Sequence, residues 1–562
     1  MTNADKYVIG LDFGTLSGRA LVVRVADGAP LGTAVHEYEH GVMDRTLDAA
    51  DGRLLPQDHA LQDPADYLRT LGTIVPAAVA DSGVDPDRIV GIGLDFTSAT
   101  VLACRADGTP LCQDERFVND PQAWVKLWKH HGAVEQADRI VELARQRQEP
   151  WLARYGGILS SEMLMPKVLE TCQKSPEVYQ STEVFCDALD WMTWQLTGTL
   201  SFAAGDSGYK RMYQDGTYPS TEFLGLLDER FADVFETKMN APVLPLGAKV
   251  GGLTREWARK LGLPSGIAVA SGNIDAHATA AAIQAVDDGQ MTAIMGTSAC
   301  YVVSGPELKE VPGMFGVVDG GLVDGSWGYE AGQTAVGDIF GWFIKHAVPA
   351  EYQNEAAERG ISVHDLLTER AEMQEVGEHG LIALDWHNGN RSILADADLS
   401  GVIVGQTLAT RAEDQYRALL EAAAFGARTI LESFRDAGVR IDELVVAGGL
   451  VHNPFFMQIL CDVVRMPLSV GRTEQPGSLG SAIFAAVAAG EYPDLPAASS
   501  AMGDKEEHVY LVDEERADQY EELYREYLLL HDYFGRGGNE VMHRLKAIRR
   551  RTHAPDHRVR MV

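Results

Sequence analysis

Short apolar runs alternate with longer amphipathic stretches along the whole chain, and the two patterns predict different elements. Four short runs rich in β-branched residues are predicted strands: YVIGLDFGT (7–15), GRALVVRV (18–25), IVGIGLDF (89–96) and ELVVAGG (443–449). Three stretches with apolar residues at helical spacing are predicted helices: EMLMPKVLETC (162–172), ALDWMTWQLTG (188–198) and RALLEAAAFGARTILESF (417–434). Strands that alternate with helices predict α/β architecture, and continuous apolar runs suit strands buried on both faces.

One apolar pattern recurs far along the chain. Residues 8–23 read VIGLDFGTLSGRALVV and residues 292–303 read TAIMGTSACYVV, and each is predicted as a strand, a Gly-Thr turn with a serine, and a second strand. A chain of 562 residues is also too long for a single core. We therefore predict two related halves that face each other, residues 1–288 and 289–562, with a charged helical tail beyond residue 505.

The segment HEYEH (36–40) matches His-Glu-x-x-His, the zinc-protease motif. Two histidines four residues apart share one face of a helix, but on a strand they lie ~13 Å apart and cannot hold one zinc ion. Gly32 and Gly41 bracket the segment, and its β-branched and aromatic residues favour a strand. We predict a strand without zinc, and a zinc hydrolase is the alternative.

Composition and charge argue against several classes of protein. Hydrophobic residues make up 46% of the chain, but no apolar run is long enough to span a membrane, and MTNADKYVIG lacks the features of a secretory signal. The cysteines include no CxxC pair, which indicates free thiols in a reducing compartment and predicts a cytoplasmic protein. A formal net charge of −33 disfavours nucleic acid and anionic membranes as partners, so local features must hold any anionic ligand.

The turn in DFGTLSGR has the chemistry of a phosphate-binding site. Gly14 permits a tight turn whose free N–H groups can surround phosphate oxygens, and Thr15 and Ser17 add hydroxyl donors. Arg19 has the planar donor fork that phosphates prefer, and Asp12, at the strand end, is placed to hold Mg²⁺ through water. The alternative is an ordinary hairpin with an Asx turn.

Two further turns extend the nucleotide hypothesis. Residues 296–299 read GTSA, and a second Gly-Thr turn facing the first would hold a polyphosphate from both sides. The segment VVAGGLVHNPFF (445–456) is predicted as a strand, a Gly-Gly loop that a flat ring can approach, and a helix. A plain turn is the alternative, because Asn453 is a good N-cap and Pro454 suits the first helical position.

Three polar residues are candidates for catalysis or sugar binding. Asp275, in SGNIDAHA, follows a glycine near the start of a predicted helix, where a carboxylate can accept a proton from an alcohol. His277 is interpreted as structural, with a metal pair formed with Asp275 as the alternative. Lys210 in SGYKRM and Glu330 in GYEAGQ can hydrogen-bond a polyol, or are solvated side chains.

Other nucleotide-binding signatures are missing from the sequence: it contains no P-loop, no Rossmann fingerprint and no complete set of protein-kinase motifs. The two Gly-Thr turns and the AGG loop together resemble the two-domain actin/hexokinase/Hsp70-like (ribonuclease H-like) ATPase fold, which has a central cleft. Over nearly its whole length the chain resembles the FGGY carbohydrate kinases, and most closely the members that phosphorylate L-ribulose. The segments that carry this resemblance are DFTSAT, ILSSEMLMPKVLE, DALDWMTWQLTG, SGYKRM, SGNIDAHA, WGYEAGQTAVGD, DWHNGNRS and HDYFGRGGNEVMHRLKAIR.

The resemblance implies roles for single residues. Asp275 matches the catalytic base, and Ser98, Lys210 and Glu330 match the sugar contacts, with Ser98 a variation at a position that is small in the family. The residues matched to ATP binding are Asp12, Gly14, Thr15 and Arg19 in the first phosphate motif, Gly296, Thr297 and Ser298 in the second, and Gly448, Gly449 and Asn453 around adenosine.

The implied reaction transfers the γ-phosphoryl group of MgATP to the 5-hydroxyl of L-ribulose, as in L-arabinose catabolism, while the two domains close over the sugar. The expected partners are the sugar and MgATP, and a homodimer is left open. The first alternative is a kinase for another ketopentose such as D-ribulose. A remote alternative is a non-enzymatic chaperone or filament protein of the same fold. The resemblance also places both histidines of HEYEH on one face of the strand that follows the first hairpin.

Overall fold

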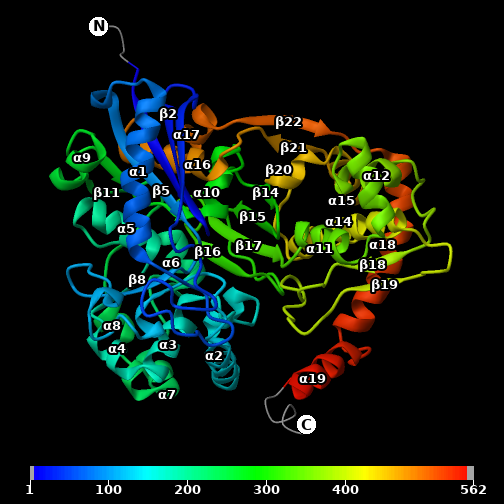
Figure 1. Ribbon diagram of the computed structural model, residues 1–562, viewed down its shortest axis with the longest axis horizontal. Coiled ribbons are helices and arrows are strands. Elements are labelled where there is room, and N and C mark those ends of the chain that lie inside the picture. Colours follow the sequence, from blue (N-terminus) through cyan, green and yellow to red (C-terminus); the bar gives the residue numbers. More distant parts are fainter. Residues whose placement is uncertain (1–4, 554–562) are drawn as a thin grey trace.

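The computed structural model describes residues 5–553, and its two large sheets stand side by side with helices between and around them (Figure 1). The first is seven-stranded, with the strand order β11-β12-β5-β1-β2-β3 and with β13 paired to β5. Its strands are β1 (Tyr7–Phe13), β2 (Ser17–Arg24), β3 (Pro30–Glu37), β5 (Ile89–Phe96), β11 (Lys249–Gly252), β12 (Ala268–Ala270) and β13 (Asn273–Ile274).

The second large sheet is also seven-stranded and has the order β16-β17-β15-β14-β20-β21-β22. Its strands are β14 (Gln290–Met295), β15 (Ala299–Gly305), β16 (Gly316–Asp319), β17 (Trp327–Gln333), β20 (Glu443–Ala447), β21 (Leu468–Gly471) and β22 (Lys505–Tyr510). The strands of the smaller sheets are β4 (Leu61–Gln62), β6 (Val101–Cys104), β7 (Val125–Lys126), β8 (Val184–Asp187), β9 (Phe202–Ala203), β10 (Val243–Leu244), β18 (Ile382–Leu384) and β19 (Val402–Val404).

The two large sheets share one pairing scheme around their Gly-Thr turns. In the first, β1 pairs antiparallel with β2 and parallel with the later strand β5. In the second, β14 pairs antiparallel with β15 and parallel with the later strand β20. The internal repeat predicted from the two hairpins is therefore confirmed, and so is the α/β architecture.

Helices cover the sheets and build most of the remaining mass. Those of the first half are α1 (Pro64–Ser82), α2 (Val134–Arg147), α3 (Leu164–Lys174), α4 (Pro176–Ser181), α5 (Ala188–Thr197), α6 (Ala204–Lys210), α7 (Thr221–Leu227), α8 (Val234–Lys238), α9 (Arg255–Leu261) and α10 (Asp275–Ala282). Those of the second half are α11 (Gly337–His346), α12 (Ala350–Arg359), α13 (Val363–Glu372), α14 (Ala412–Asp436), α15 (Pro454–Val464), α16 (Pro476–Ala488), α17 (Leu495–Met502), α18 (Glu514–Gly535) and α19 (Val541–His553).

The predicted helices are present as α3, α5 and α14, whereas the tail differs from its prediction. Its first part, β22, is a strand at the edge of the second sheet, because pairing with the backbone of β21 outweighs the polar character of its sequence. The tail becomes helical only with α18 and α19. Within residues 5–553, no helix is both long and apolar enough to cross a membrane.

Helices α10 and α16 lie between the two large sheets (Figure 1), and their small residues allow close packing. Although α16 belongs to the second half, it packs on β1 and β5 of the first. A Cβ atom at Gly10 would lie 1.7 Å from the carbonyl oxygen of Ser478, and one at Gly93 would lie 2.0 Å from that of Ser481. A helix of the second half thus completes the core of the first, and the boundary between residues 288 and 289 stays a prediction.

The two histidines of HEYEH lie in different structural settings. His36 is on the edge strand β3, where its Nδ1 lies 3.1 Å from the hydroxyl of Thr70. The strand ends at Glu37, so His40 lies beyond it, with its Nδ1 3.3 Å from the carboxylate of Asp66. Within the described residues, no group of candidate metal ligands contains both histidines. The segment is thus not the helical pair that the zinc-protease motif requires, which argues against the zinc hydrolase alternative, and the expectation that both residues share one strand is corrected.

Candidate active site

Carboxylates gather where neighbouring strands of the first sheet end. Asp12 on β1 and Asp95 on β5 are register partners, and Asn273 on β13 is the partner of Asp95 on its other side. Asp275 follows β13 directly and begins helix α10. The parallel strands thus bring three carboxylates from distant parts of the chain to one edge of the sheet.

Asp95 is a candidate site residue that the sequence patterns did not predict. Its side chain is fully buried, one carboxylate oxygen accepts a hydrogen bond of 2.7 Å from Ser481, and the other has no hydrogen-bond partner in the described structure. Burial and the charge of Asp12 raise the pKa of Asp95. A signal was present, because the tetrapeptide GLDF occurs both at residues 10–13 and at residues 93–96.

Asp275 has the properties of a group that exchanges a proton near neutral pH. Its side chain is partly buried, and one carboxylate oxygen accepts a hydrogen bond of 2.7 Å from the N–H of Ala276. Burial, followed by repulsion from Asp12, raises the pKa of Asp275 to about 7. A base with a pKa near the working pH is well suited to accept a proton from an alcohol.

The first Gly-Thr turn is held from several sides. The N–H of Gly14 donates to the carbonyl of Ser17 at 3.0 Å, and the side chain of Gln62 donates to the carbonyl of Thr15 at 2.7 Å. Arg19 forms an ion pair of 3.0 Å with its cross-strand neighbour Asp12, and its side chain remains 39% exposed. The turn is therefore rigid, and an accessible guanidinium stands beside it.

The second Gly-Thr turn is supported by the start of helix α11. The N–H groups of Val336 and Gly337 donate to the carbonyls of Thr297 and Gly296 at 2.8 and 2.9 Å. The residues at the tip of the turn, Thr297 and Ser298, are exposed. The tip is thus fixed by its backbone while its hydroxyl side chains face outward.

The AGG loop follows β20 and packs against the second turn. Gly448 has a φ of 96°, and a Cβ atom there would lie 2.5 Å from the carbonyl oxygen of Met295, the residue before that turn. Gly449, in contrast, faces open space, because apart from its chain neighbours no described atom lies within 4 Å of the position that a Cβ atom would take. Asn453 caps helix α15 by accepting a hydrogen bond of 3.0 Å from the N–H of Phe456. Packing explains the first glycine and capping explains Asn453, so only Gly449 offers room for a ring.

The candidate sugar residues Lys210 and Glu330 contact each other across the two halves. The ammonium of Lys210 lies 3.0 and 3.1 Å from the two carboxylate oxygens of Glu330, and both side chains are buried. His277 Nε2 lies 3.2 Å from the same carboxylate. Burial alone would raise the pKa of Glu330, but Lys210 and His277 hold it well below its ordinary value. His277 therefore faces Glu330, and among the described residues it forms a group of three candidate metal ligands with Cys300 and Glu330, a group that does not include Asp275.

Ser98 lies two residues beyond β5, in a loop beside the Asp275 segment. The strands that lead to the two residues are paired, with Ile274 the register partner of Phe96. Ser98 is partly exposed, and the hydroxyls of its buried neighbours Thr97 and Thr100 lie 2.8 Å apart. The structure thus brings Ser98 and Asp275 to the same edge of the first sheet.

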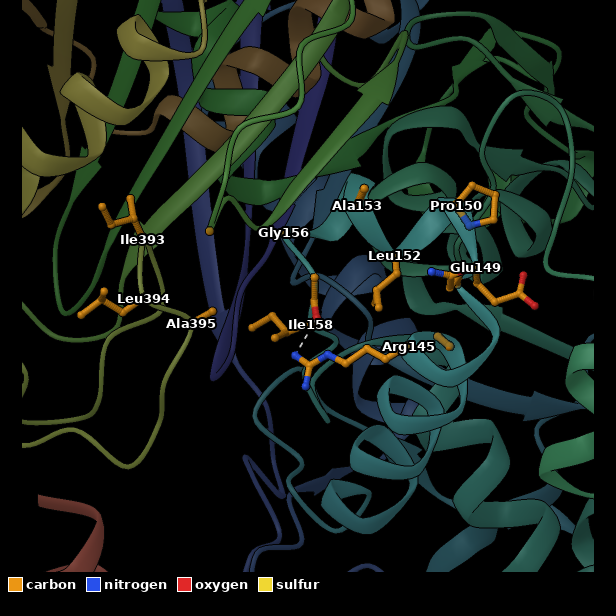
Figure 2. Close-up of a pocket in the computed structure, with 14 residues that line it drawn as sticks. Arg145, Glu149, Pro150, Leu152, Ala153, Gly156, Ile158, Ile393, Leu394 and Ala395 are labelled. Atoms are coloured by element: carbon orange, nitrogen blue, oxygen red, sulfur yellow. Dashed lines mark hydrogen bonds between the residues drawn. The ribbon is translucent and has the colours of Figure 1, made fainter. Parts of the chain in front are cut away.

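A cavity of about 550 Å³ lies between the two halves, outside this cluster (Figure 2). Its lining comes from the segment 144–158 of the first half and from Gly313 and residues 393–395 of the second, and it does not include Asp275. An ion pair of 3.0 Å between Arg391 and Glu162 also joins the two halves. The two halves therefore make specific contacts beyond those of Lys210 and Glu330.

Comparison with known proteins identifies the class of enzyme. Residues 291–489 match the C-terminal domain of the FGGY family of carbohydrate kinases, and one curated relative is 54% identical over 546 residues, which cover 97% of each chain. The chain therefore belongs to the FGGY family of carbohydrate kinases, enzymes that use ATP to phosphorylate a sugar. That relative is named Ribulokinase, from Mycolicibacterium smegmatis. Another Ribulokinase, from Geobacillus thermodenitrificans, is 47% identical over 549 residues, 96% of this chain and 97% of its own.

Solved structures support the fold. A gluconate kinase from Lactobacillus acidophilus superimposes with a TM-score of 0.77 at 17% identity, covering 95% of this chain and 99% of its own. A xylulose kinase from Rhodospirillum rubrum has a TM-score of 0.76 at 23% identity, covering 94% and 98%. The predicted two-domain actin/hexokinase/Hsp70-like fold is confirmed. Because the family consists of kinases, the prediction of an enzyme is confirmed over the chaperone or filament protein.

Proposed function

We propose that this enzyme phosphorylates L-ribulose at its 5-hydroxyl with MgATP, as a step of L-arabinose catabolism. The observation that carries the proposal is the arrangement of Asp275, with its pKa near 7, in electrostatic contact with the buried Lys210–Glu330 pair. A base and a polar pair that matches polyol hydroxyls are thus combined in one place. The relatives named Ribulokinase support the choice of sugar.

In this proposal each side chain of the sugar site has one task. Asp275 accepts the proton of the attacking hydroxyl, and Lys210, Glu330 and Ser98 orient the ketose. Lys210 donates hydrogen bonds, while the ionised carboxylate of Glu330 only accepts them, so the pair can bind sugar hydroxyls both as acceptors and as donors. Orientation matters because phosphoryl transfer depends mainly on positioning and charge stabilisation.

The nucleotide is held by the two turns and the AGG loop. The residues that we assign to the phosphates are Asp12, Gly14, Thr15, Ser17, Arg19, Gly296, Thr297 and Ser298, and those around adenosine are Gly448, Gly449 and Asn453. The rigid turns and the exposed guanidinium of Arg19 provide donors for phosphate oxygens in a chain that otherwise repels anions. The open space at Gly449 suits the approach of the adenine ring.

The residues at the end of the first sheet fit Mg²⁺. Asp12 and Asp95 offer carboxylate oxygens, the ligand type that Mg²⁺ prefers, and one buried oxygen of Asp95 has no hydrogen-bond partner in the described structure. We assign Asp12 as the residue that holds the ion through water, with Asp95 beside it. When bound, Mg²⁺ neutralises charge on the phosphates.

Three further parts of the proposal concern the whole molecule. The two halves close over the sugar, which excludes water as a competing nucleophile. The protein works in the cytoplasm, in keeping with its unpaired cysteines. A homodimer would change none of these assignments, since the residues assigned to the site come from one chain.

The test is ADP release with L-ribulose, D-ribulose, D-xylulose, glycerol or no sugar. We expect L-ribulose to give the highest kcat/KM, and a higher value for D-ribulose would select the alternative ketopentose kinase. The Lys210→Met variant serves as the matched control, because it keeps the nucleotide residues and loses the sugar donor. Equal ADP release with and without sugar in the wild-type enzyme would refute the proposal.

A further inference from the structure

Lys167 on helix α3 is a fully buried lysine with no role in the mechanism above. Its side chain has 0% exposure, yet among the described residues its ammonium has no carboxylate partner within hydrogen-bond distance. It instead donates to three backbone carbonyls, those of Ala99 at 2.7 Å, Leu127 at 2.8 Å and Trp128 at 3.5 Å. Because buried polar groups need partners, this one ammonium ties the loop before β6 to the segment after β7.

Both of these segments lie next to residues that we assign to a substrate site. Ala99 follows the sugar-site residue Ser98 and has a φ of 44°, a left-handed conformation that an alanine adopts only when its surroundings hold it there. Trp128 donates a hydrogen bond of 3.1 Å from its indole N–H to the hydroxyl of Thr15, in the first phosphate turn. A path of hydrogen bonds therefore runs from the sugar loop through one ammonium to the phosphate turn.

We propose that Lys167 is a positioning residue that couples the binding of the sugar to the binding of the nucleotide. The inference rests on the proposed function, because it takes Ser98 and Thr15 as parts of the two substrate sites. When the sugar fixes the loop around Ala99, Lys167 holds the Trp128 segment, and Trp128 in turn holds Thr15. The phosphate turn is then already in place when the nucleotide binds, so the bound sugar raises the affinity for the nucleotide. By thermodynamic linkage, the bound nucleotide raises the affinity for the sugar by the same factor.

A second buried lysine in the same region provides a matched control. Lys126 is 2% exposed, and its ammonium donates to Gln122, Glu170, Thr171 and the carbonyl of Lys167. Gln122 precedes β7 and the other partners lie on α3, and none is a residue of the sugar loop or the phosphate turn. Loss of Lys126 thus removes a buried ammonium without breaking the contacts from Ala99 to Thr15.

The experiment measures the affinity for L-ribulose by calorimetry, with and without Mg²⁺ and a non-hydrolysable ATP analogue. For the wild-type enzyme we expect the analogue to tighten sugar binding ~10-fold, a typical size for coupling between two sites. In Lys167→Met the factor should fall to ~2 or less. Trp128→Phe, which keeps Lys167 and loses only the bond to Thr15, should lose the coupling as well and serves if Lys167→Met does not fold.

Three results separate the inference from its rivals. Lys126→Met should lower Tm but keep the wild-type coupling factor, which would show that the loss is not a general effect of a missing buried lysine. Unchanged coupling in Trp128→Phe or Lys167→Met, or no coupling in the wild-type enzyme, would overturn the inference and leave the kinase assignment intact. Failure of the wild-type enzyme to bind L-ribulose at all would refute the proposed function.

Discussion

Replacement of Asp275 by asparagine should abolish turnover and at the same time stabilise the folded enzyme. Asparagine has nearly the same shape but cannot accept the proton of a sugar hydroxyl, so kcat should fall by ~10³-fold, within the range for loss of a general base. The sugar contacts of Lys210 and Glu330 remain, so the affinity for L-ribulose should change little. The two effects have one cause, a carboxylate kept in surroundings that disfavour its charge.

The size of the stabilisation follows from the pKa of Asp275. A rise from 3.8 to about 7 corresponds to at most ~4 kcal/mol, and because the side chain is partly exposed we expect ~1–3 kcal/mol. The folded enzyme binds this proton more tightly than the unfolded chain does. The wild-type enzyme therefore loses this stability as the pH rises from about 4 to about 7, whereas the asparagine variant does not.

The assay is urea unfolding of both proteins at pH 5 and pH 8, together with steady-state kinetics. The variant should be more stable at pH 8, and the difference should shrink at pH 5. Asp319→Asn, at an exposed position of β16, is the control and should change neither stability nor kcat. Near-wild-type turnover in Asp275→Asn, or no gain in stability at pH 8, would refute the reasoning.

Three other predictions concern the sugar pair, the core and the histidine motif. Lys210→Met and Glu330→Gln should each lower the free energy of unfolding by ~3 kcal/mol and raise KM for the sugar, because each change removes the oppositely charged partner of a buried group. The double variant should lose less than the sum of the two in a urea double-mutant cycle. Gly10→Ala should lower the free energy of unfolding by at least ~3 kcal/mol in urea unfolding, because its Cβ would meet the α16 backbone, whereas Gly72→Ala, on an exposed helix face, should not destabilise the enzyme. Metal analysis should find no stoichiometric zinc, and alanine at both histidines of residues 36–40 should leave kcat unchanged; a stoichiometric zinc ion bound there would contradict this.

Local patterns were sufficient to predict the hairpins and the sheet class. The order of apolar residues and a Gly-Thr turn defines a hairpin within some fifteen residues, and the parallel partners β5 and β20 were recognisable as buried strands. HEYEH shows the limit of a short motif, because two histidines four residues apart can share a metal on a helix but not on a strand, and the strand β3 ends between them.

Contacts between distant segments could not be derived from the same patterns. Lys210 and Glu330 are 120 residues apart, and nothing in the sequence around either residue indicates that one neutralises the other. The pairing depends on how α6 and β17 are placed by two different sheets. The hydrogen bonds of Lys167 could not be predicted from the sequence for a related reason. Its partners are backbone carbonyls, which every residue has whatever its side chain, so no residue type marks them.

The packing of α16 on β1 and β5 has a consequence for synthesis of the chain. Residues 7–96 leave the ribosome long before residues 476–488, yet the glycines of β1 and β5 are fitted to the backbone of that later helix. Until α16 has been synthesised, one apolar face of the first sheet therefore stays uncovered. In such a state a growing polypeptide depends on chaperones to avoid aggregation. By the same reasoning, separately expressed fragments split within the loop before α16 should reassemble only when both are present.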